Sequence, residues 1–244
     1  MLPTRPKTIL VLRHSPNVGP GYLEDFIKRR GLIQQVVALD AGDDLPENPD
    51  EFGAIVVLGG EMSVHSEKDF PFLKKENEFI RQSVKMDVPY LGLCLGGQLL
   101  AKAMSGKVTL NPVKEIGPYE IALNAEGMKD PLFAGFPDRF PFCQWHSDTF
   151  SELPPEAVLL AGSTACKHQA FRYGKTAYGL QFHPEATTLV LKQWCREFGS
   201  DLESPAHGHR VQEKYALCAA DCVKHSDRLF KNFFQTANVI ASPA

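Results

Sequence analysis

The sequence predicts an α/β fold in which a mostly parallel, twisted central sheet is flanked by helices. In the first half of the chain, short apolar runs of strand length alternate with amphipathic segments of helix length. The connections between them are short enough for the right-handed crossovers that join parallel strands. At 244 residues, with 43% hydrophobic and 23% charged side chains, the chain can bury the core that such a sheet requires.

The first half of the chain supplies four strands and three helices to this prediction. Each strand is a nearly continuous apolar run, which is typical of strands buried on both faces, and the four lie at 7–13, 35–39, 54–58 and 89–93. The helices are expected at 22–30, 70–84 and 95–104. Gly31 and Gly106 follow the first and third of these helices, at positions where glycine commonly ends a helix.

The second half is less regular. Short β-rich segments broken by Pro and Gly are expected at 108–110, 119–123, 158–161 and 169–173. A core-like strand follows at 177–182, and then a helix at 188–198. We expect residues 1–198 to form one domain, with a polar loop (199–210) and a C-terminal helix (211–234) in the remaining segment, 199–244, packed on it.

Composition excludes several classes of protein. The net charge is −3 and Lys and Arg are scattered, so we expect no nucleic-acid partner. No apolar stretch approaches the roughly 20 residues that span a bilayer, and the run 9–12 is too short for a signal peptide, so we expect a cytoplasmic protein with no membrane partner. The six cysteines are then free thiols. Cys218, Cys222 and His225 fall on an apolar helix stripe, so we expect packing there and no metal.

The most informative segment is 88–101, VPYLGLCLGGQLLA. It reads as a strand, then Gly-x-Cys-x-Gly, then a helix, which is the arrangement of a nucleophile elbow. Cys94 would stand at a helix N-terminus, where the dipole favours the reactive thiolate, and the N–H of Leu95 would face a developing oxyanion. Taken alone, the motif also suits a small buried cysteine packed against glycines.

A thiol nucleophile needs a base, and His183 is the best placed of the eight histidines. It directly follows an apolar strand, at the sheet edge where parallel strands place functional groups. Glu185 lies two residues further and can orient the imidazole, while Pro184 stiffens the link between them. His146 remains the alternative base. Gly60, which follows another buried strand, can supply a second backbone donor for the oxyanion.

Together these segments resemble the class I glutamine amidotransferase family, in particular the amidotransferase domain of GMP synthase and free-standing γ-glutamyl peptidases. The resemblance covers roughly residues 7–198 and rests on Gly59-Gly60, on the elbow GLCLGGQ and on FHPE, in the family's order. The sequence departs from the family after Gly60, where Glu61-Met62-Ser63 stands. The resemblance implies a flavodoxin-like architecture with a C-terminal helical extension.

For function, the resemblance implies that Cys94, His183 and Glu185 form a catalytic triad that cleaves a γ-glutamyl amide through a thioester. It also implies oxyanion donors at Gly60 and Leu95, and substrate-binding roles for Gln98, His146, Ser147 and Asp148. No cofactor is implied. The partner is then a small-molecule glutamine or γ-glutamyl substrate. No Gly-rich phosphate loop of the ATP-pyrophosphatase type is visible, so we expect that the chain alone does not make GMP.

Two alternatives stay open. The chain can be a glutaminase subunit that delivers ammonia to a separate synthetase, or a non-catalytic relative that binds a ligand or partner. The simultaneous presence of Cys94, His183 and Glu185 argues against the second alternative, because an inactive scaffold has no chemical need for all three. The sequence does not name the amine side of the substrate.

Overall fold

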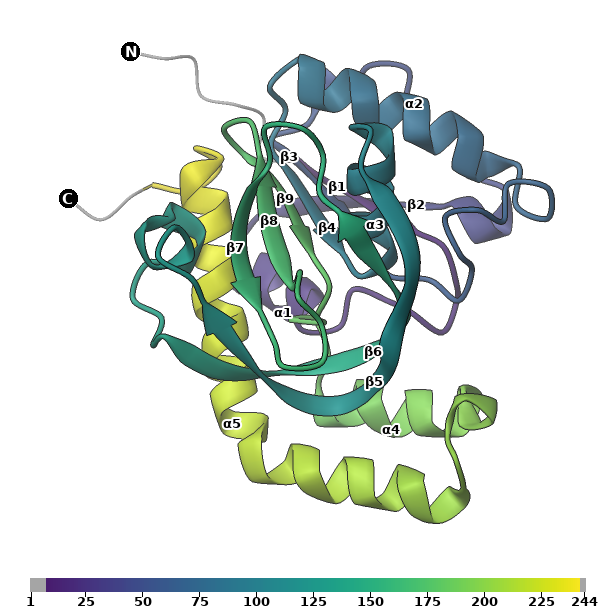
Figure 1. Ribbon diagram of the computed structural model, residues 1–244. Helices are drawn as coiled ribbons and strands as arrows, with labels where there is room; N and C mark the ends of the chain where they lie inside the picture. Colours follow the sequence, from purple (N-terminus) through teal and green to yellow (C-terminus); the bar gives the residue numbers. More distant parts are fainter. Residues whose placement is uncertain (1–7, 242–244) are drawn as a thin grey trace.

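The computed structural model describes residues 8–241. The two chain ends, 1–7 and 242–244, lie outside it, and so does Lys7, the first residue of the first predicted strand. Its centre is one nine-stranded sheet with strand order β2-β1-β3-β4-β9-β8-β7-β5-β6, flanked by helices (Figure 1). The predicted α/β class is therefore confirmed. Among the described residues, no helix combines the length and the apolar composition needed to cross a membrane.

Five neighbouring strands form the parallel part of the sheet. Their register pairs β1 with β2 and β3, β3 with β4, and β4 with β9. Their bounds are β1 Thr8–Arg13, β2 Ile33–Ala38, β3 Ala54–Val57, β4 Tyr90–Leu93 and β9 Ala177–Leu180. All residues of β3, β4 and β9 are buried, as expected of strands covered on both faces. The parallel pairing brings the carboxyl ends of β1, β3, β4 and β9 to one edge of the sheet.

The remaining strands are antiparallel and curve beside the parallel part (Figure 1). They are β5 Lys107–Leu123, β6 Arg139–Glu152, β7 Val158–Gly162 and β8 Ala170–Tyr173. The sequence prediction was wrong in two respects here. The segments 108–110 and 119–123 belong to one long bent strand, and β6 was not predicted at all.

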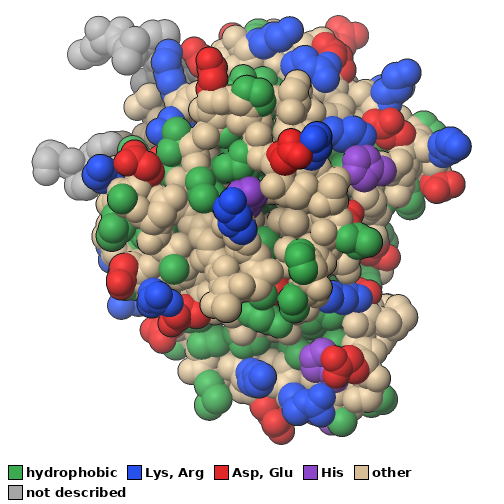
Figure 2. Space-filling model, viewed as in Figure 1, with side chains coloured by type: hydrophobic (Ala, Val, Ile, Leu, Met, Phe, Trp, Pro, Cys, Tyr) green, Lys and Arg blue, Asp and Glu red, His purple; other side chains and the backbone are tan. Residues whose placement is uncertain are grey.

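Helices cover both faces of the sheet. Buried side chains of α1 and α5 share one core cluster with the strands, and those of α2 and α3 share the opposite cluster. The helices are α1 Tyr22–Arg29, α2 Phe72–Lys85, α3 Leu95–Ala103, α4 Thr188–Glu197 and α5 Pro205–Thr236. Single 3₁₀ turns occur at Leu39–Ala41, Pro49–Glu51, Gly127–Lys129, Pro131–Phe133 and Gly199–Asp201. Acidic and basic side chains are interspersed over the face that Figure 2 shows.

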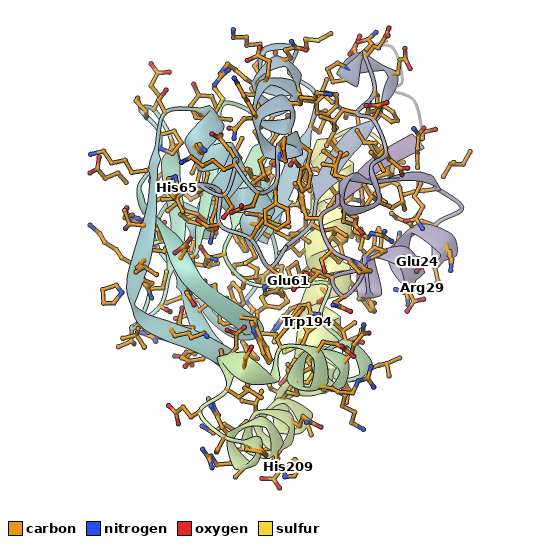
Figure 3. All side chains as sticks on the ribbon, turned by 90° about the vertical axis from the view of Figure 1, so that its right-hand side faces the viewer. Glu24, Arg29, Glu61, His65, Trp194 and His209 are labelled. Carbon is orange, nitrogen blue, oxygen red and sulfur yellow. The ribbon has the colours of Figure 1, made fainter. Side chains whose placement is uncertain are left out.

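The predicted polar loop 199–210 is wrong from Pro205 onward, because α5 begins there. The Ser204 side chain accepts a hydrogen bond from the His207 backbone N–H, and Pro205 occupies the first helical turn, which together make a strong helix start. The helix then runs across the molecule, with exposed His209 near its outer end (Figure 3). Of the three residues expected to pack there, Cys222 and His225 are buried and Cys218 is partly buried.

Candidate active site

Cys94 stands at the turn between β4 and α3 with backbone angles φ 49° and ψ −105°. Positive φ costs a non-glycine residue free energy, and the surrounding structure must impose it. The Cys94 N–H donates to Leu180 O at 2.8 Å, which fixes the turn against β9. A Cβ at Gly92 would lie 2.3 Å from Gly96 O, and one at Gly96 would lie 2.2 Å from Val57 O. The two glycines are therefore required for the turn to close.

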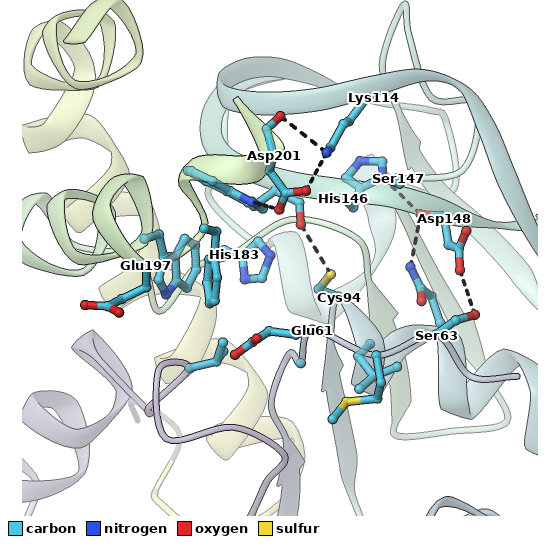
Figure 4. A pocket seen from close by; sticks show the side chains of 18 of the residues that line it. Glu61, Ser63, Cys94, Lys114, His146, Ser147, Asp148, His183, Glu197 and Asp201 are labelled. Atoms are coloured by element: carbon cyan, nitrogen blue, oxygen red, sulfur yellow. Dashed lines mark hydrogen bonds and ion pairs between the residues drawn. The ribbon is translucent and has the colours of Figure 1, made fainter. Parts of the chain in front are cut away.

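Cys94 is buried, with 6% of the residue exposed. Its Sγ is 3.8 Å from the carbonyl oxygen of Trp145 and 3.7 Å from Nε2 of Gln181. The side chain points into the cavity shown in Figure 4. The sulfur is thus held between strand β6 and the segment that leaves β9, with one side open to a ligand.

His183 and Glu185 form a buried pair beside Cys94. Nδ1 of His183 donates to Oε1 of Glu185 at 2.7 Å, while Nε2 has no partner among the described residues. A Cβ placed on Gly59 would lie 3.2 Å from Cε1 of His183 and 3.7 Å from Cβ of Cys94, so both side chains flank the same glycine. The ring also contacts Trp194 edge-on, with centroids 4.8 Å apart.

The electrostatics of this pair favour a charged imidazole. Burial lowers the pKa of His183, but the charges of Glu185 and Cys94 and the hydrogen bond to Glu185 outweigh burial and raise the pKa to about 10. The imidazole can therefore hold a proton at neutral pH and give it to a group that lies beside the sulfur.

Three backbone contacts fix the segment that carries the pair. The hydroxyl of Tyr215 donates to Ala186 O at 2.7 Å, and that of Ser226 donates to Pro184 O at 2.6 Å. Both donors belong to α5, and both are buried. From α1, the N–H of Tyr22 donates to Glu185 O at 2.9 Å. The C-terminal helix therefore supports the candidate site directly, which sequence reasoning did not predict.

Gly60 and Leu95, the expected oxyanion donors, lie close together. A Cβ on Gly60 would lie 2.6 Å from Cδ2 of Leu95, and both residues line the cavity. Leu95 is the first residue of α3, and N–H groups of a first turn have no acceptor within their own helix. The backbone N–H of Gly60 has no hydrogen-bond acceptor within residues 8–241. Both groups are therefore available to a ligand.

The expected substrate-binding residues lie along the same wall but differ in what they face. The Gln98 amide donates to Asp148 O at 3.0 Å, and Oδ2 of Asp148 accepts from the Ser63 hydroxyl at 2.9 Å. Ser147, the neighbour of Asp148 in the chain, also lines the cavity. The His146 ring is engaged elsewhere, with Nε2 2.9 Å from Glu115 Oε2 and Nδ1 3.0 Å from Asp148 O. The structure thus gives His146 no free ring nitrogen with which to act as a base.

One group among the described residues has the composition of a metal site. The ligand atoms of Glu115, His146 and Cys166 lie within 4.8 Å of one another, and all three residues are buried. Hydrogen bonds already use these atoms. Glu115 accepts from Ser163 and Gln169 as well as from His146, and Cys166 Sγ lies 3.2 Å from the Thr149 hydroxyl. The cluster is a satisfied polar network that supports strands β5 and β6.

The cavity at the site has a volume of about 400 Å³. Its far wall was missed by sequence reasoning, because it joins residues distant in the chain. Nζ of Lys114 on β5 lies 2.6 Å from Asp201 Oδ1, and Nε1 of Trp145 donates to Asp201 Oδ2 at 3.0 Å (Figure 4). Partial burial raises the pKa of Asp201, but these hydrogen bonds outweigh it and hold the pKa below its usual value. Nothing in the local sequence around 199–201 signals this contact.

Two acidic side chains line the cavity on the side away from Asp148. Figure 3 places Glu61 and Trp194 near one another at the centre of the molecule, and Figure 4 shows Glu61 facing the space in front of His183. The Glu61 carboxylate accepts from the Ser15 hydroxyl at 2.5 Å, and Glu197 lies further out on α4. Glu61 belongs to the segment where the sequence departs from the pattern after Gly60, and that departure was the available signal.

Comparison with known proteins gives a consistent result. The family model "Glutamine amidotransferase class-I" matches residues 23–197. A glutamine amidotransferase-like protein of Salmonella typhimurium is 38% identical over 82% of this chain and 84% of its own length. A glutamine-hydrolysing GMP synthase subunit of Methanothermobacter thermautotrophicus is 34% identical over 61% of this chain and 70% of its own. A crystal structure of a glutamine amidotransferase from Thermotoga maritima superposes with a TM-score of 0.85 at 30% identity, covering 93% of this chain and 98% of that one.

Proposed function

Because the chain belongs to the class I glutamine amidotransferase family, we propose that it hydrolyses the γ-glutamyl amide bond of glutamine or of a γ-glutamyl peptide. One observation carries the proposal. A thiol at a strained strand–helix turn and a buried His183–Glu185 pair flank the same glycine, Gly59, at a cavity of about 400 Å³. A nucleophile, its base and the orienter of that base must lie close together, and these contacts support that arrangement.

The reaction we propose begins with attack by Cys94 Sγ on the γ-carbonyl carbon. The carbonyl oxygen becomes an oxyanion that accepts hydrogen bonds from the N–H groups of Gly60 and Leu95. The His183 imidazolium then gives its Nε2 proton to the leaving nitrogen, the C–N bond breaks, and a γ-glutamyl thioester remains. Water attacks the thioester while His183 takes its proton, which releases glutamate and restores the thiolate. Glu185 holds the ring in place and stabilises its charged form.

The substrate would lie along the wall formed by Gln98, Ser147 and Asp148. Gln98 and the backbone at Asp148 are joined by a hydrogen bond, so they present a fixed surface next to Cys94. His146 also lines the cavity, and it would contribute by holding Asp148 O in place. The cavity continues past Cys94 toward Lys114 and Asp201, which leaves room for an amine portion larger than ammonia.

The test is steady-state release of glutamate by the purified chain over a panel of glutamine and γ-glutamyl dipeptides, with and without a chelator and ATP. We expect turnover of at least one compound, unaffected by either addition, because every step above uses groups of the chain itself. Cys94→Ala is the control, and it should abolish turnover while the protein stays folded. Absence of turnover on the whole panel, or turnover that survives Cys94→Ala, would refute the proposal.

A second candidate is a glutaminase subunit that supplies ammonia to a synthetase. The similarity to the GMP synthase subunit of Methanothermobacter thermautotrophicus favours it. In such systems, docking of the synthetase completes the site and raises a weak basal activity. Weak release of glutamate by the chain alone, followed by strong activation when a co-purified synthetase is added, would select this candidate over the free-standing hydrolase.

A further inference from the structure

His14 lies directly behind the candidate oxyanion site and takes no part in the reaction above. It follows β1, and its side chain is completely buried together with that of Glu76 from α2. Nε2 of His14 lies 2.9 Å and 3.0 Å from the two carboxylate oxygens of Glu76, and Nδ1 lies 3.1 Å from Gly59 O. The ring therefore joins a buried carboxylate to the backbone between Gly59 and Gly60.

Both ring nitrogens of His14 face acceptors, so both must carry a hydrogen. Burial lowers the pKa of His14, but the charge of Glu76 and its hydrogen bond, together with the bond to Gly59, outweigh burial and leave the pKa raised. The donor at Nδ1 is thus part of an imidazolium, and its bond to Gly59 O is charge-assisted, which is stronger than a neutral one.

Gly59 O and the N–H of Gly60 belong to the same planar peptide unit and point in opposite directions. A bond that draws the carbonyl back toward His14 therefore turns the N–H away from His14. Gly60 lines the cavity, and its N–H has no acceptor within residues 8–241. The peptide needs such a restraint, because glycine on both sides makes the rotated orientation accessible as well.

We propose that His14 and Glu76 are positioning residues that hold the Gly59–Gly60 peptide with its N–H directed at the reacting carbonyl oxygen. The inference rests on the proposed function, since it assigns a purpose to the donor at Gly60. Glu76 acts on His14, His14 acts on the peptide, and only the peptide meets the substrate. A ring without Nδ1–H would leave the peptide free to rotate.

Two variants of similar shape distinguish the roles of the two ring nitrogens of His14. In His14→Asn the side-chain amide nitrogen can take the place of Nδ1 and keep the bond to Gly59 O. In His14→Gln it can take the place of Nε2 and keep the contact with Glu76 instead. Loss of one oxyanion donor lowers kcat by 10²–10³-fold in known cases, so we expect His14→Gln to lower kcat by about 10- to 100-fold with little change in KM. His14→Asn should keep most of the activity.

If His14 only stabilised the fold, its replacement would also change the reactivity of Cys94 and the thermal stability of the protein. We therefore measure the rate of Cys94 alkylation by iodoacetamide, a displacement that forms no oxyanion, and the midpoint of thermal unfolding of each variant. Unchanged alkylation with a reduced kcat in His14→Gln supports the proposal. A kcat near that of the parent in His14→Gln, or an equal fall in kcat and alkylation in both variants, overturns it.

Crystal structures of the two variants test the proposal without turnover, so that it can fail independently of the proposed function. We expect Gly59 O to face residue 14 in His14→Asn and to be rotated away in His14→Gln. The same peptide orientation in both variants would overturn the inference even if the parent hydrolyses γ-glutamyl amides. If the parent hydrolyses none of them, the proposed function fails and these structures alone decide the orientation.

Discussion

Tyr215→Phe tests whether the C-terminal helix positions the catalytic segment or only stabilises the protein. The change deletes one oxygen atom. That oxygen donates to Ala186 O at 2.7 Å, and Tyr215 is 1% exposed, so water cannot replace the hydrogen bond. Ala186 closes the turn that begins at His183, because its N–H donates to His183 O at 3.2 Å. The loss therefore falls on the backbone that carries the imidazole.

The magnitude follows from the burial of the carbonyl that is left behind. A buried acceptor without a donor costs about 1–3 kcal/mol of unfolding free energy. For a chain of this size each kcal/mol shifts Tm by about 2–4 °C, so we expect a fall of roughly 2–12 °C. Ser226 still holds Pro184 O at 2.6 Å, so the turn loosens without detaching. Since misplacement of reacting groups by 1 Å can cost about 100-fold, we expect a partial displacement to lower kcat by roughly 3- to 30-fold.

The assay is γ-glutamyl hydrolysis at 25 °C, well below the expected Tm, together with thermal unfolding of each protein. Tyr173→Phe is the matched control, because this half-buried tyrosine on β8 makes no side-chain hydrogen bond within residues 8–241. It should leave both kcat and Tm close to those of the parent. A lowered Tm with unchanged kcat in Tyr215→Phe would refute the positioning argument and leave α5 a role in stability only.

Four further outcomes are expected. A chloroketone or diazo analogue of glutamine should label Cys94, and peptide mapping that finds the label mainly on another cysteine would exclude this nucleophile. His183→Ala should lower kcat by several orders of magnitude and Glu185→Gln by less, because the imidazole transfers protons whereas the carboxylate orients it. Loss of the orienter is still severe, about 10⁴-fold in serine triads. Because the imidazolium is the proton donor in the proposed reaction and its pKa is raised to about 10, kcat/KM should fall as pH rises through about 10. In Glu185→Gln that alkaline fall should move to lower pH, because the carboxylate charge is one cause of the raised pKa; an unmoved profile would show that another group titrates. Asp201→Asn should raise KM for γ-glutamyl dipeptides more than for glutamine, because Lys114 and Asp201 close the part of the cavity beyond the sulfur.

Much of the parallel sheet could be predicted because its strands carry their own signals. The continuous apolar runs and the glycines of the elbow require no long-range information. The sequence did not predict strand β6, and the reason is physical. Its inward positions alternate regularly, but after Phe140 and Phe142 they are occupied by Gln144 and His146, which are buried and polar. The Gln144 amide donates to Gln169 Oε1, and His146 Nε2 lies 2.9 Å from Glu115 Oε2. Polar side chains are thus buried here through contacts with distant residues, and the apolar alternation that marks a strand is absent.

The prediction missed the start of α5 because residues 199–210 are polar, and polarity alone favours a loop. Ser204-Pro205 is a helix start, and Gly208 sits where a Cβ would lie 3.0 Å from Leu202, so it marks close packing. In the candidate site, Cys94 and His183 could be named because each follows a recognisable strand, and Glu185 because it lies two residues beyond His183. Asp201 could not, since it lies 87 residues from its partner Lys114 and only the folded chain brings the two together.

The division of the site between two parts of the sheet has a consequence for how such a protein can change over generations. Cys94 and the His183 segment follow β4 and β9, which pair directly, with Leu93 opposite Leu180. Their spacing is thus set by a backbone ladder that tolerates many side-chain replacements. The far wall of the cavity is supplied by β5 and by the residues after α4, outside the parallel strands. If the proposed function holds, mutations there can alter which amine is accommodated without shifting the thiol relative to its base, so selectivity and chemistry can diverge at different rates.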